Sequence, residues 1–172
     1  MTPVTAIIAL GSNLAEPVAQ IHAAVAAIDA LPHTRVTAVS ALYRTAPVGY
    51  TGQPDFINAV LQAETALAAA DLLAALHGIE QAAGRERSFR NAPRTLDLDI
   101  IDYGGQVHDS DTLQLPHPRA FERGFVMIPL AEIAPDYRLP GHPPSAAAQA
   151  ERLAAEGGVQ RWQDWAADST VE

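Results

Sequence analysis

The chain has 172 residues, 48% of them hydrophobic and 18% charged, which is typical of one globular domain and excludes a disordered or collagen-like chain. It contains no cysteine, so disulfide frameworks, thiolate nucleophiles, zinc fingers and iron–sulfur clusters are excluded. Its formal net charge of −9 excludes a broadly basic surface, and we therefore expect it to bind neither nucleic acid nor a membrane.

All 11 basic residues are arginine, because the sequence contains no lysine. That absence excludes a Walker-type P-loop, a protein-kinase active site and a Schiff-base enzyme, since each of them depends on a lysine side chain. No basic region precedes the first apolar run, and no apolar stretch approaches the roughly 18 residues that span a bilayer. We therefore expect a cytoplasmic protein.

The first half of the chain predicts a strand, a helix and two further strands. Thr5–Leu10 is an apolar run that ends at a Gly-Ser-Asn turn, and Glu16–Leu31 carries apolar residues at helical spacing. Alternation and β-branched residues predict a strand over Arg35–Thr45. The loop Ala46–Asp55, rich in proline and glycine, then leads to a strand over Phe56–Glu64.

The next segments predict a helix and a strand. Apolar residues share one face of Ala70–Ala83, and Gly84 is placed as a C-terminal cap. Strict alternation predicts a strand over Arg94–Tyr103, which a Gly-Gly hairpin turn would connect to residues 106–108.

The succession β-α-β-β-α-β predicts an α+β fold with a ferredoxin-like core, an antiparallel sheet on which helices pack. Further helices are predicted near Phe125–Ile133 and over Ser145–Glu156. We expect one domain over residues 1–172, in which residues 139–172 form a C-terminal appendage packed on the rest.

Two acids lie two positions apart in one predicted strand. Because alternate side chains of a strand share a face, Asp97 and Asp99 point the same way. Two adjacent carboxylates repel unless a cation neutralises them, and Mg²⁺ prefers such oxygen ligands, although an exposed polar strand face is the alternative. Nearby arginines suit phosphate and favour metal-dependent phosphoryl or nucleotidyl transfer. These are Arg85, Arg87, Arg90, Arg94, Arg119 and Arg123.

A histidine, two phenylalanines and an asparagine are further candidates. His117 lies between two prolines in a loop near arginines, where it could donate to phosphate or move a proton, or simply be exposed. Phe56 and Phe125 adjoin polar segments and could either stack on a planar ring or belong to the core. Asn58 can offer a donor and an acceptor to the edge of a heterocycle.

Several motifs occur in order over residues 7–136, and together they resemble the 6-hydroxymethyl-7,8-dihydropterin pyrophosphokinase family of folate biosynthesis. The longest is Pro93-Arg94-Thr95-Leu96-Asp97-Leu98-Asp99-Ile100. The others are Ala9-Leu10-Gly11-Ser12-Asn13-Leu14, Tyr43-Arg44-Thr45-Ala46-Pro47-Val48-Gly49, Gln53-Pro54-Asp55-Phe56-Ile57-Asn58-Ala59, Ile79-Glu80, Gly84-Arg85-Glu86-Arg87, Pro116-His117-Pro118-Arg119 and Arg123-Gly124-Phe125.

The resemblance implies an αβα protein that transfers diphosphate from ATP to the hydroxymethyl oxygen of the pterin and leaves AMP. It implies that Asp97 and Asp99 hold two Mg²⁺ ions, and that Arg85 and Arg94 contact phosphates. We accordingly expect a monomer whose partners are two small molecules, ATP and the pterin.

The resemblance also implies two sets of binding residues and two lids, over residues 46–55 and 85–93. The pterin would be bound by Thr45, Val48, Phe56, Asn58, Asp97 and Phe125. The nucleotide would be bound by His77, Glu80, Arg87, Ile100, His117, Pro118 and Arg123.

The sequence departs from the family pattern at three of these places. Asn91 stands where a tryptophan is frequent, and His77 and Pro118 stand where glutamine and tyrosine are frequent. None of these changes removes the acid pair, so an active enzyme is expected. Two alternatives stay open: an idle member that only binds nucleotide or pterin, and a Mg²⁺-dependent nucleotidyl- or monophosphoryl-transferase.

Overall fold

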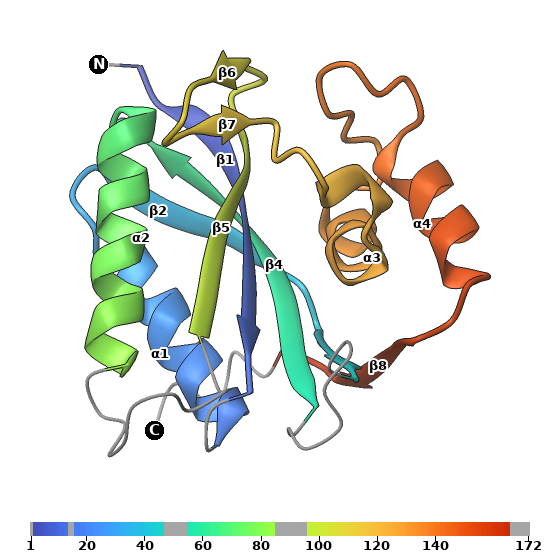
Figure 1. Cartoon of the computed structure of the whole chain (residues 1–172). Coiled ribbons are helices and arrows are strands. Elements are labelled where there is room, and N and C mark those ends of the chain that lie inside the picture. The colour runs from blue at the N-terminus through green and yellow to red at the C-terminus, as the bar shows by residue number, and fades with distance from the viewer. Residues whose placement is uncertain (1, 14–15, 47–54, 85–95, 166–172) are drawn as a thin grey trace.

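The protein folds into three layers, a sheet with helices on both faces, in a computed structural model that describes residues 2–13, 16–46, 55–84 and 96–165 (Figure 1). In chain order the elements are β1 (Val4–Ser12), α1 (Pro17–Asp29), β2 (Thr34–Val39), β3 (Leu42–Thr45), β4 (Phe56–Thr65), α2 (Ala69–Gly84), β5 (Leu96–Tyr103), β6 (His108–Asp109), β7 (Gln114–Leu115), the 3₁₀ helix η1 (Ala120–Glu122), α3 (Gly124–Ile133), α4 (Ala146–Ala154) and β8 (Val159–Gln163).

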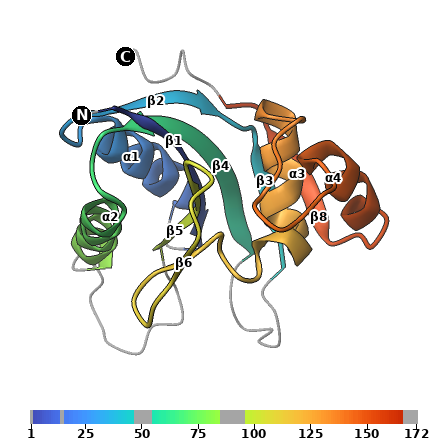
Figure 2. The same ribbon diagram turned by 90° about the horizontal axis from the view of Figure 1, so that it is seen from above.

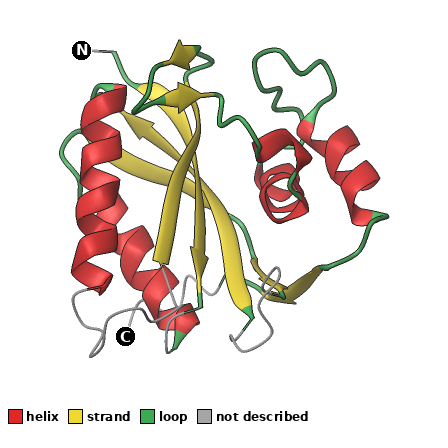
Figure 3. Ribbon diagram, viewed as in Figure 1, coloured by secondary structure: helices red, strands yellow, loops and turns green. Residues whose placement is uncertain are grey.

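Among the described residues, the main sheet has six strands, and all of their pairings are antiparallel. Its order is β5-β1-β4-β3-β8, with β2 also paired to β4, while β6 and β7 form a separate two-stranded sheet. Helices α1 and α2 lie on one face of the main sheet and α3 and α4 on the other, as Figures 2 and 3 show. The arrangement confirms the α+β fold with a ferredoxin-like core.

Both faces of the central strand β1 are buried. Ile8 and Leu10 belong to the apolar cluster shared with α1 and α2, whereas Ile7 and Ala9 belong to the cluster shared with α3 and α4. A strand that is covered on both faces needs apolar residues at every position. This explains why β1 reads as a continuous apolar run instead of an alternating one.

The strand expected over residues 35–45 is in fact two strands, β2 and β3, which pair with different parts of β4. At the break, the buried Ser40 donates its backbone N–H to the Val60 carbonyl (2.9 Å), and its hydroxyl accepts the Val60 N–H (3.0 Å). The N–H of Ala41 donates to the Glu132 carboxylate of α3 (3.1 Å). Side chains thus satisfy the broken ladder, which sequence alternation does not reveal.

The prediction of a hairpin after Tyr103 is wrong, although the predicted Gly-Gly turn forms. Gly104 and Gly105 have φ values of +61° and +74°, and a Cβ on Gly104 would lie 3.1 Å from the Cβ of Val4. Beyond the turn, β6 pairs with β7 and not with β5. Strand β1 occupies one edge of β5. At the other edge, the carboxylate of Glu80 in α2 accepts the backbone N–H of Leu98.

The C-terminal part contributes a strand that the sequence did not predict. Strand β8 pairs with β3 at the edge of the main sheet. Helix α4, which precedes it, begins after Ser145, whose hydroxyl accepts the Ala148 N–H (3.2 Å) as an N-cap. Among the described residues, no helix has the length and apolar character that crossing a membrane requires.

Candidate active site

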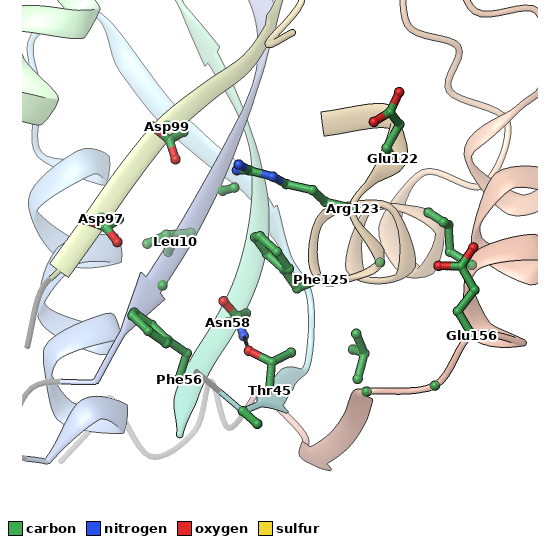
Figure 4. A pocket seen from close by; sticks show the side chains of 18 residues that line it. Leu10, Thr45, Phe56, Asn58, Asp97, Asp99, Glu122, Arg123, Phe125 and Glu156 are labelled. Carbon is green, nitrogen blue, oxygen red and sulfur yellow. Dashed lines mark hydrogen bonds between the residues drawn. The ribbon is translucent and has the colours of Figure 1, made fainter. Parts of the chain in front are cut away.

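A cleft of about 660 Å³ opens on the face of the sheet that carries α3 and α4 (Figure 4). Strands β1, β4 and β5 form its floor, and β3, the start of α3 and the connection between α4 and β8 form its walls. The described residues that line it are Ala9, Leu10, Gly11, Thr45, Ala46, Phe56, Asn58, Asp97, Asp99, Glu122, Arg123, Gly124, Phe125, Leu153, Glu156, Gly157, Gly158 and Val159.

The two acids of β5 both face this cleft. Asp97 and Asp99 line it, while Leu98 between them is buried in the apolar cluster on the opposite face. Beside them in β1 lie Gly11, opposite Asp97, and Ala9, opposite Asp99. These small neighbours leave open space in front of both carboxylates.

The acid pair fits a magnesium site by the chemistry of its donors. Mg²⁺ binds in proteins through one or two carboxylates and takes its other ligands from water and substrate phosphates. Within the described ranges, no group of three or more His, Cys, Asp or Glu side chains could hold a metal ion. A metal held by Asp97 and Asp99 would therefore need oxygen atoms from water and from a bound phosphate.

Asn58 lies on the floor of the cleft with a fixed orientation. Its side-chain Nδ2 donates to the hydroxyl of Thr45 (2.9 Å), and only 5% of the residue is exposed. A Cβ added to Gly11 would lie 3.1 Å from Asn58 Oδ1 and 3.9 Å from a ring carbon of Phe56. The glycine therefore keeps the floor clear between Asn58 and Asp97, which it also adjoins.

Two aromatic rings and a guanidinium project into the same cleft. Phe56 comes from the start of β4 and Phe125 from the first turn of α3 (Figure 4). Arg123, which caps the N-terminus of α3, reaches towards β5, and its Cζ lies 5.4 Å from the ring centroid of Phe125. An apolar slot beside a cation and two acids can bind a flat ring that carries a phosphorylated or metal-bound group.

His117 lies next to β5 but does not line the described cleft. Its backbone N–H donates to the Ile101 carbonyl (2.9 Å), and its ring Nδ1 accepts the Arg119 N–H (3.2 Å). Partial burial lowers the pKa of His117, and the nearby Asp99 carboxylate opposes this shift. Because Nδ1 accepts, a neutral ring carries its proton on Nε2, where it can donate to an anion.

Four other residues expected to bind nucleotide also lie outside the described cleft lining. Glu80 of α2 accepts the Leu98 N–H through Oε2 (2.7 Å), and burial raises the pKa of this carboxyl. Ile100 is buried in the cluster under α1 and α2, so its side chain points away from the acids. His77 of α2 and Pro118 are exposed. These residues surround the outer edge of β5 and not the floor of the cleft.

The structure thus brings together seven of the residues expected at the site, and it adds one wall that sequence reasoning missed. The seven are Thr45, Phe56, Asn58, Asp97, Asp99, Arg123 and Phe125. The missed wall consists of Leu153, Glu156, Gly157, Gly158 and Val159, for which only the Gly-Gly pair offered a turn signal. The expected Val48, Arg85, Arg87 and Arg94 and most of both lids lie outside the described residues.

Comparison with known families gives a match over most of the chain. The family described as 7,8-dihydro-6-hydroxymethylpterin-pyrophosphokinase (HPPK) matches residues 7–135. A 2-amino-4-hydroxy-6-hydroxymethyldihydropteridine pyrophosphokinase of Pseudomonas aeruginosa is 53% identical over 133 residues, which cover 77% of this chain and 82% of the relative. The enzyme of the same name from Haemophilus influenzae is 47% identical over 137 residues, covering 80% and 86%.

Solved structures share the fold at much lower sequence identity. Plasmodium falciparum HPPK-DHPS, crystallised with pterin and p-hydroxybenzoate, matches with a TM-score of 0.72 at 12% identity over 94% of this chain. An HPPK-DHPS crystallised with substrates matches with a TM-score of 0.70 at 11% identity over 91%. This chain spans 45% and 44% of those two longer chains.

Proposed function

The chain belongs to the 7,8-dihydro-6-hydroxymethylpterin-pyrophosphokinase family, and we infer from this that it transfers diphosphate from ATP to the hydroxymethyl group of 6-hydroxymethyl-7,8-dihydropterin, releasing AMP, in folate biosynthesis. The observation that supports this function most strongly is the arrangement of three residues on the floor of the cleft. Asp97, Gly11 and Asn58 lie side by side on β5, β1 and β4. The floor therefore runs from a phosphate-activating acid pair to a ring-recognising amide.

We propose that the pterin lies between Phe56 and Phe125. Both rings project into the cleft, and offset stacking on a flat heterocycle suits them. Because the Thr45 hydroxyl accepts a hydrogen bond from Asn58 Nδ2, the Oδ1 of Asn58 is oriented to accept from an amino group or ring N–H of the pterin. This polarity would favour a donor-bearing ring edge over an acceptor-bearing one.

We propose that Asp97 and Asp99 hold two Mg²⁺ ions together with the phosphates of ATP. Bound there, the metal would neutralise the charge that develops during transfer and would bring the attacked phosphorus to the hydroxyl. The contribution of the two aspartates is to fix both carboxylates on one strand face, next to the pterin floor. Alignment of the hydroxymethyl oxygen supplies proximity, so no covalent enzyme intermediate is required.

Two groups near β5, the Arg123 guanidinium at the start of α3 and the His117 ring, would bind the phosphates. Arg123 reaches towards β5 from the start of α3, and a neutral His117 can donate from Nε2 near Asp99. Both groups would stabilise the extra negative charge on the transferred diphosphate. We also assign nucleotide contacts to the surroundings of His77, Glu80, Ile100 and Pro118, along the outer edge of β5.

We propose that the chain acts as one domain and as a monomer. Strand β8 of the C-terminal part pairs with β3 of the main sheet, and both parts contribute residues to the described cleft lining, which supports one domain. Light scattering at the assay concentration should give the mass of one chain, and a dimer mass would contradict the proposal.

The product nucleotide tests the proposed reaction directly. Purified protein is incubated with ATP, Mg²⁺ and the pterin, and the nucleotides are separated by chromatography. We expect AMP that depends on both the pterin and Mg²⁺, and its loss in Asp97→Asn and Asp99→Asn. Asp109→Asn is the matched control, because Asp109 is an exposed strand aspartate remote from the cleft lining.

Each other product would identify a different reaction. ADP would mean transfer of a single phosphoryl group, and free pyrophosphate would mean nucleotidyl transfer. If the protein bound the pterin and a non-hydrolysable ATP analogue by titration calorimetry but released no AMP, it would be a binding module and the proposed activity would be wrong.

A further inference from the structure

A buried aspartate of the strand that carries the acid pair is hydrogen-bonded, outside the cleft, to a partly buried tyrosine. Asp102 of β5 has no exposed surface, and its Oδ2 accepts hydrogen bonds from the Tyr137 hydroxyl and from the Gly105 N–H (3.1 Å). Its Oδ1 is also buried and accepts no hydrogen bond from the described residues. Because a buried carboxylate with incomplete hydrogen bonding costs stability, packing alone does not explain this acid.

Asp102 directly follows a bulge of β5 that is hydrogen-bonded to the loop of His117. The pairing of β1 with β5 passes from Ile100 to Asp102, so Ile101 is the extra residue of the bulge. The carbonyl of Ile101 accepts the backbone N–H of His117 (2.9 Å). Asp99 lies only two residues before Ile101, so the bulge sets the course of the acid-bearing strand and of this loop together.

The second member of the pair, Tyr137, is held by backbone hydrogen bonds. It lies between α3 and α4, where its N–H donates to the Ala134 carbonyl (3.1 Å) and its own carbonyl accepts the Ala146 N–H (2.8 Å). Helix α3 runs from this segment back to the cleft, where it begins with Gly124 and Phe125. The side-chain hydrogen bond therefore connects the far end of α3 to the bulge of β5.

We propose that Asp102 and Tyr137 are positioning residues that fix how β5 and α3 meet and so set the width of the active-site cleft. Asp99 lies on one side of that width and Phe125 on the other, and neither member of the pair lines the described cleft. A displacement of about 1 Å at a reacting centre can cost up to about 100-fold in rate, so a remote pair can control turnover. The inference rests on the diphosphate transfer proposed above.

The decisive variant replaces both polar partners by apolar ones, Asp102→Leu with Tyr137→Phe. Because apolar side chains of similar shape often substitute for a buried polar pair without loss, we expect a melting temperature equal to or above that of the wild type. We nevertheless expect kcat to fall by about tenfold or more, because the course of β5 is no longer fixed. Affinity for a non-hydrolysable ATP analogue with Mg²⁺, measured by calorimetry without turnover, should fall as well.

Two further variants separate positioning from stability. Asp102→Asn keeps an acceptor for the Tyr137 hydroxyl, so it should retain kcat and analogue affinity within about twofold, whereas Tyr137→Phe alone should lower both. Tyr103→Phe is the matched control, since the Tyr103 hydroxyl also makes a partly buried hydrogen bond, to the Leu67 carbonyl, but on the α1 and α2 side. It should lower the melting temperature and leave kcat unchanged.

The outcomes distinguish this inference from the proposed function. Wild-type kcat and analogue affinity in the folded double variant would overturn the positioning role. If the double variant did not fold, the same result in Tyr137→Phe would overturn it. Absence of AMP with the wild-type protein would instead contradict the proposed reaction itself.

Discussion

The two faces of the main sheet differ in how completely helices cover them. On one face, α1 and α2 bury an apolar cluster that includes Leu10, Leu61 and Leu98. On the other face, α3 and α4 cover a second apolar cluster, but the ends of β1, β4 and β5 line a cleft. The same strands therefore contribute to the core on one side and to the floor of the cleft on the other.

The difference shows how a small domain can place costly polar groups without losing its core. Leu98 is buried on the covered face, while its neighbours Asp97 and Asp99 project into the cleft, where phosphate and metal can approach. Strand alternation alone separates the two roles. Substitutions on one face should accordingly alter stability and those on the other face should alter turnover.

The sharpest contrast lies within β5. We expect Asp99→Asn to lower kcat by about 100- to 1000-fold, because the proposed metal site would lose a carboxylate charge that stabilises the transition state. The free energy of unfolding of Asp99→Asn should stay equal or rise, since the repulsion between residue 99 and Asp97 is relieved. Leu98→Ala should instead lower the free energy of unfolding by about 2–5 kcal/mol through a cavity in the core.

Steady-state kinetics and urea unfolding of both variants check this contrast. Leu98→Ala should retain its kcat per folded molecule under conditions where it is folded. A large loss of stability in Asp99→Asn, with little change in kcat, would show that the acid serves the fold.

Gly11 allows a second comparison, between one Gly→Ala change that should alter pterin binding and one that should alter only stability. Because a Cβ at Gly11 would lie 3.1 Å from Asn58 Oδ1, Gly11→Ala should raise the KM for the pterin by about tenfold through displacement of that amide. At Gly78 of α2, no atom of the described residues lies within 4 Å of the added Cβ. Gly78→Ala should stabilise the protein by about 0.5–1 kcal/mol and leave KM unchanged. Equal KM values for the two variants would contradict the role of Gly11.

Two threonine hydrogen bonds at opposite ends of β4 give a smaller contrast. Thr45→Val removes the acceptor that orients Asn58, and we expect the KM for the pterin to rise about fivefold, which corresponds to one hydrogen bond of about 1 kcal/mol. Thr34→Val removes the bond between the hydroxyls of Thr34 and Thr65 (2.7 Å), far from the cleft. The free energy of unfolding of Thr34→Val should fall by about 1 kcal/mol, and its KM should stay unchanged. A KM effect in Thr34→Val would argue for a general loosening of β4.

The smallest effect concerns pH on the covered face. His22 of α1 stacks on Trp165, with ring centroids 4.1 Å apart, and burial lowers the pKa of His22 below its usual 6.5. Between the lowered pKa and 6.5 the unfolded chain binds more protons, so the free energy of unfolding should fall as pH decreases below 6.5. His22→Gln should flatten this slope in urea titrations from pH 7.5 to 5.5. An unchanged slope would assign the pH dependence to other groups.

Much of the fold and part of the cleft could be predicted from local patterns. The continuous apolar run of β1 and the alternation of β5 indicated buried strands, and the spacing of Asp97 and Asp99 placed both carboxylates on one face. These features depend only on the period of a strand. The family motifs added Thr45 and gave Asn58 and the two phenylalanines a specific role in binding the pterin, and all four residues line the cleft.

The remaining features depend on contacts between distant segments. The break at Ser40 is stabilised by a hydroxyl and by Glu132 of α3, more than 90 residues away. Strand β8 pairs with β3 and carries mostly exposed side chains, so its sequence shows no apolar alternation. The wall that ends at Val159 follows from that pairing and could not be read from local sequence. Nor does local sequence show that Glu80 accepts a backbone N–H of β5.

The most direct test of diphosphate transfer follows the individual phosphorus atoms of ATP. The wild-type protein is incubated with Mg²⁺, the pterin and ATP that is radiolabelled at the α, β or γ position in separate reactions. We expect the β and γ labels to appear together in the pterin product and the α label to remain in AMP. Transfer of the γ label alone, or appearance of the α label in the pterin product, would contradict the proposed reaction.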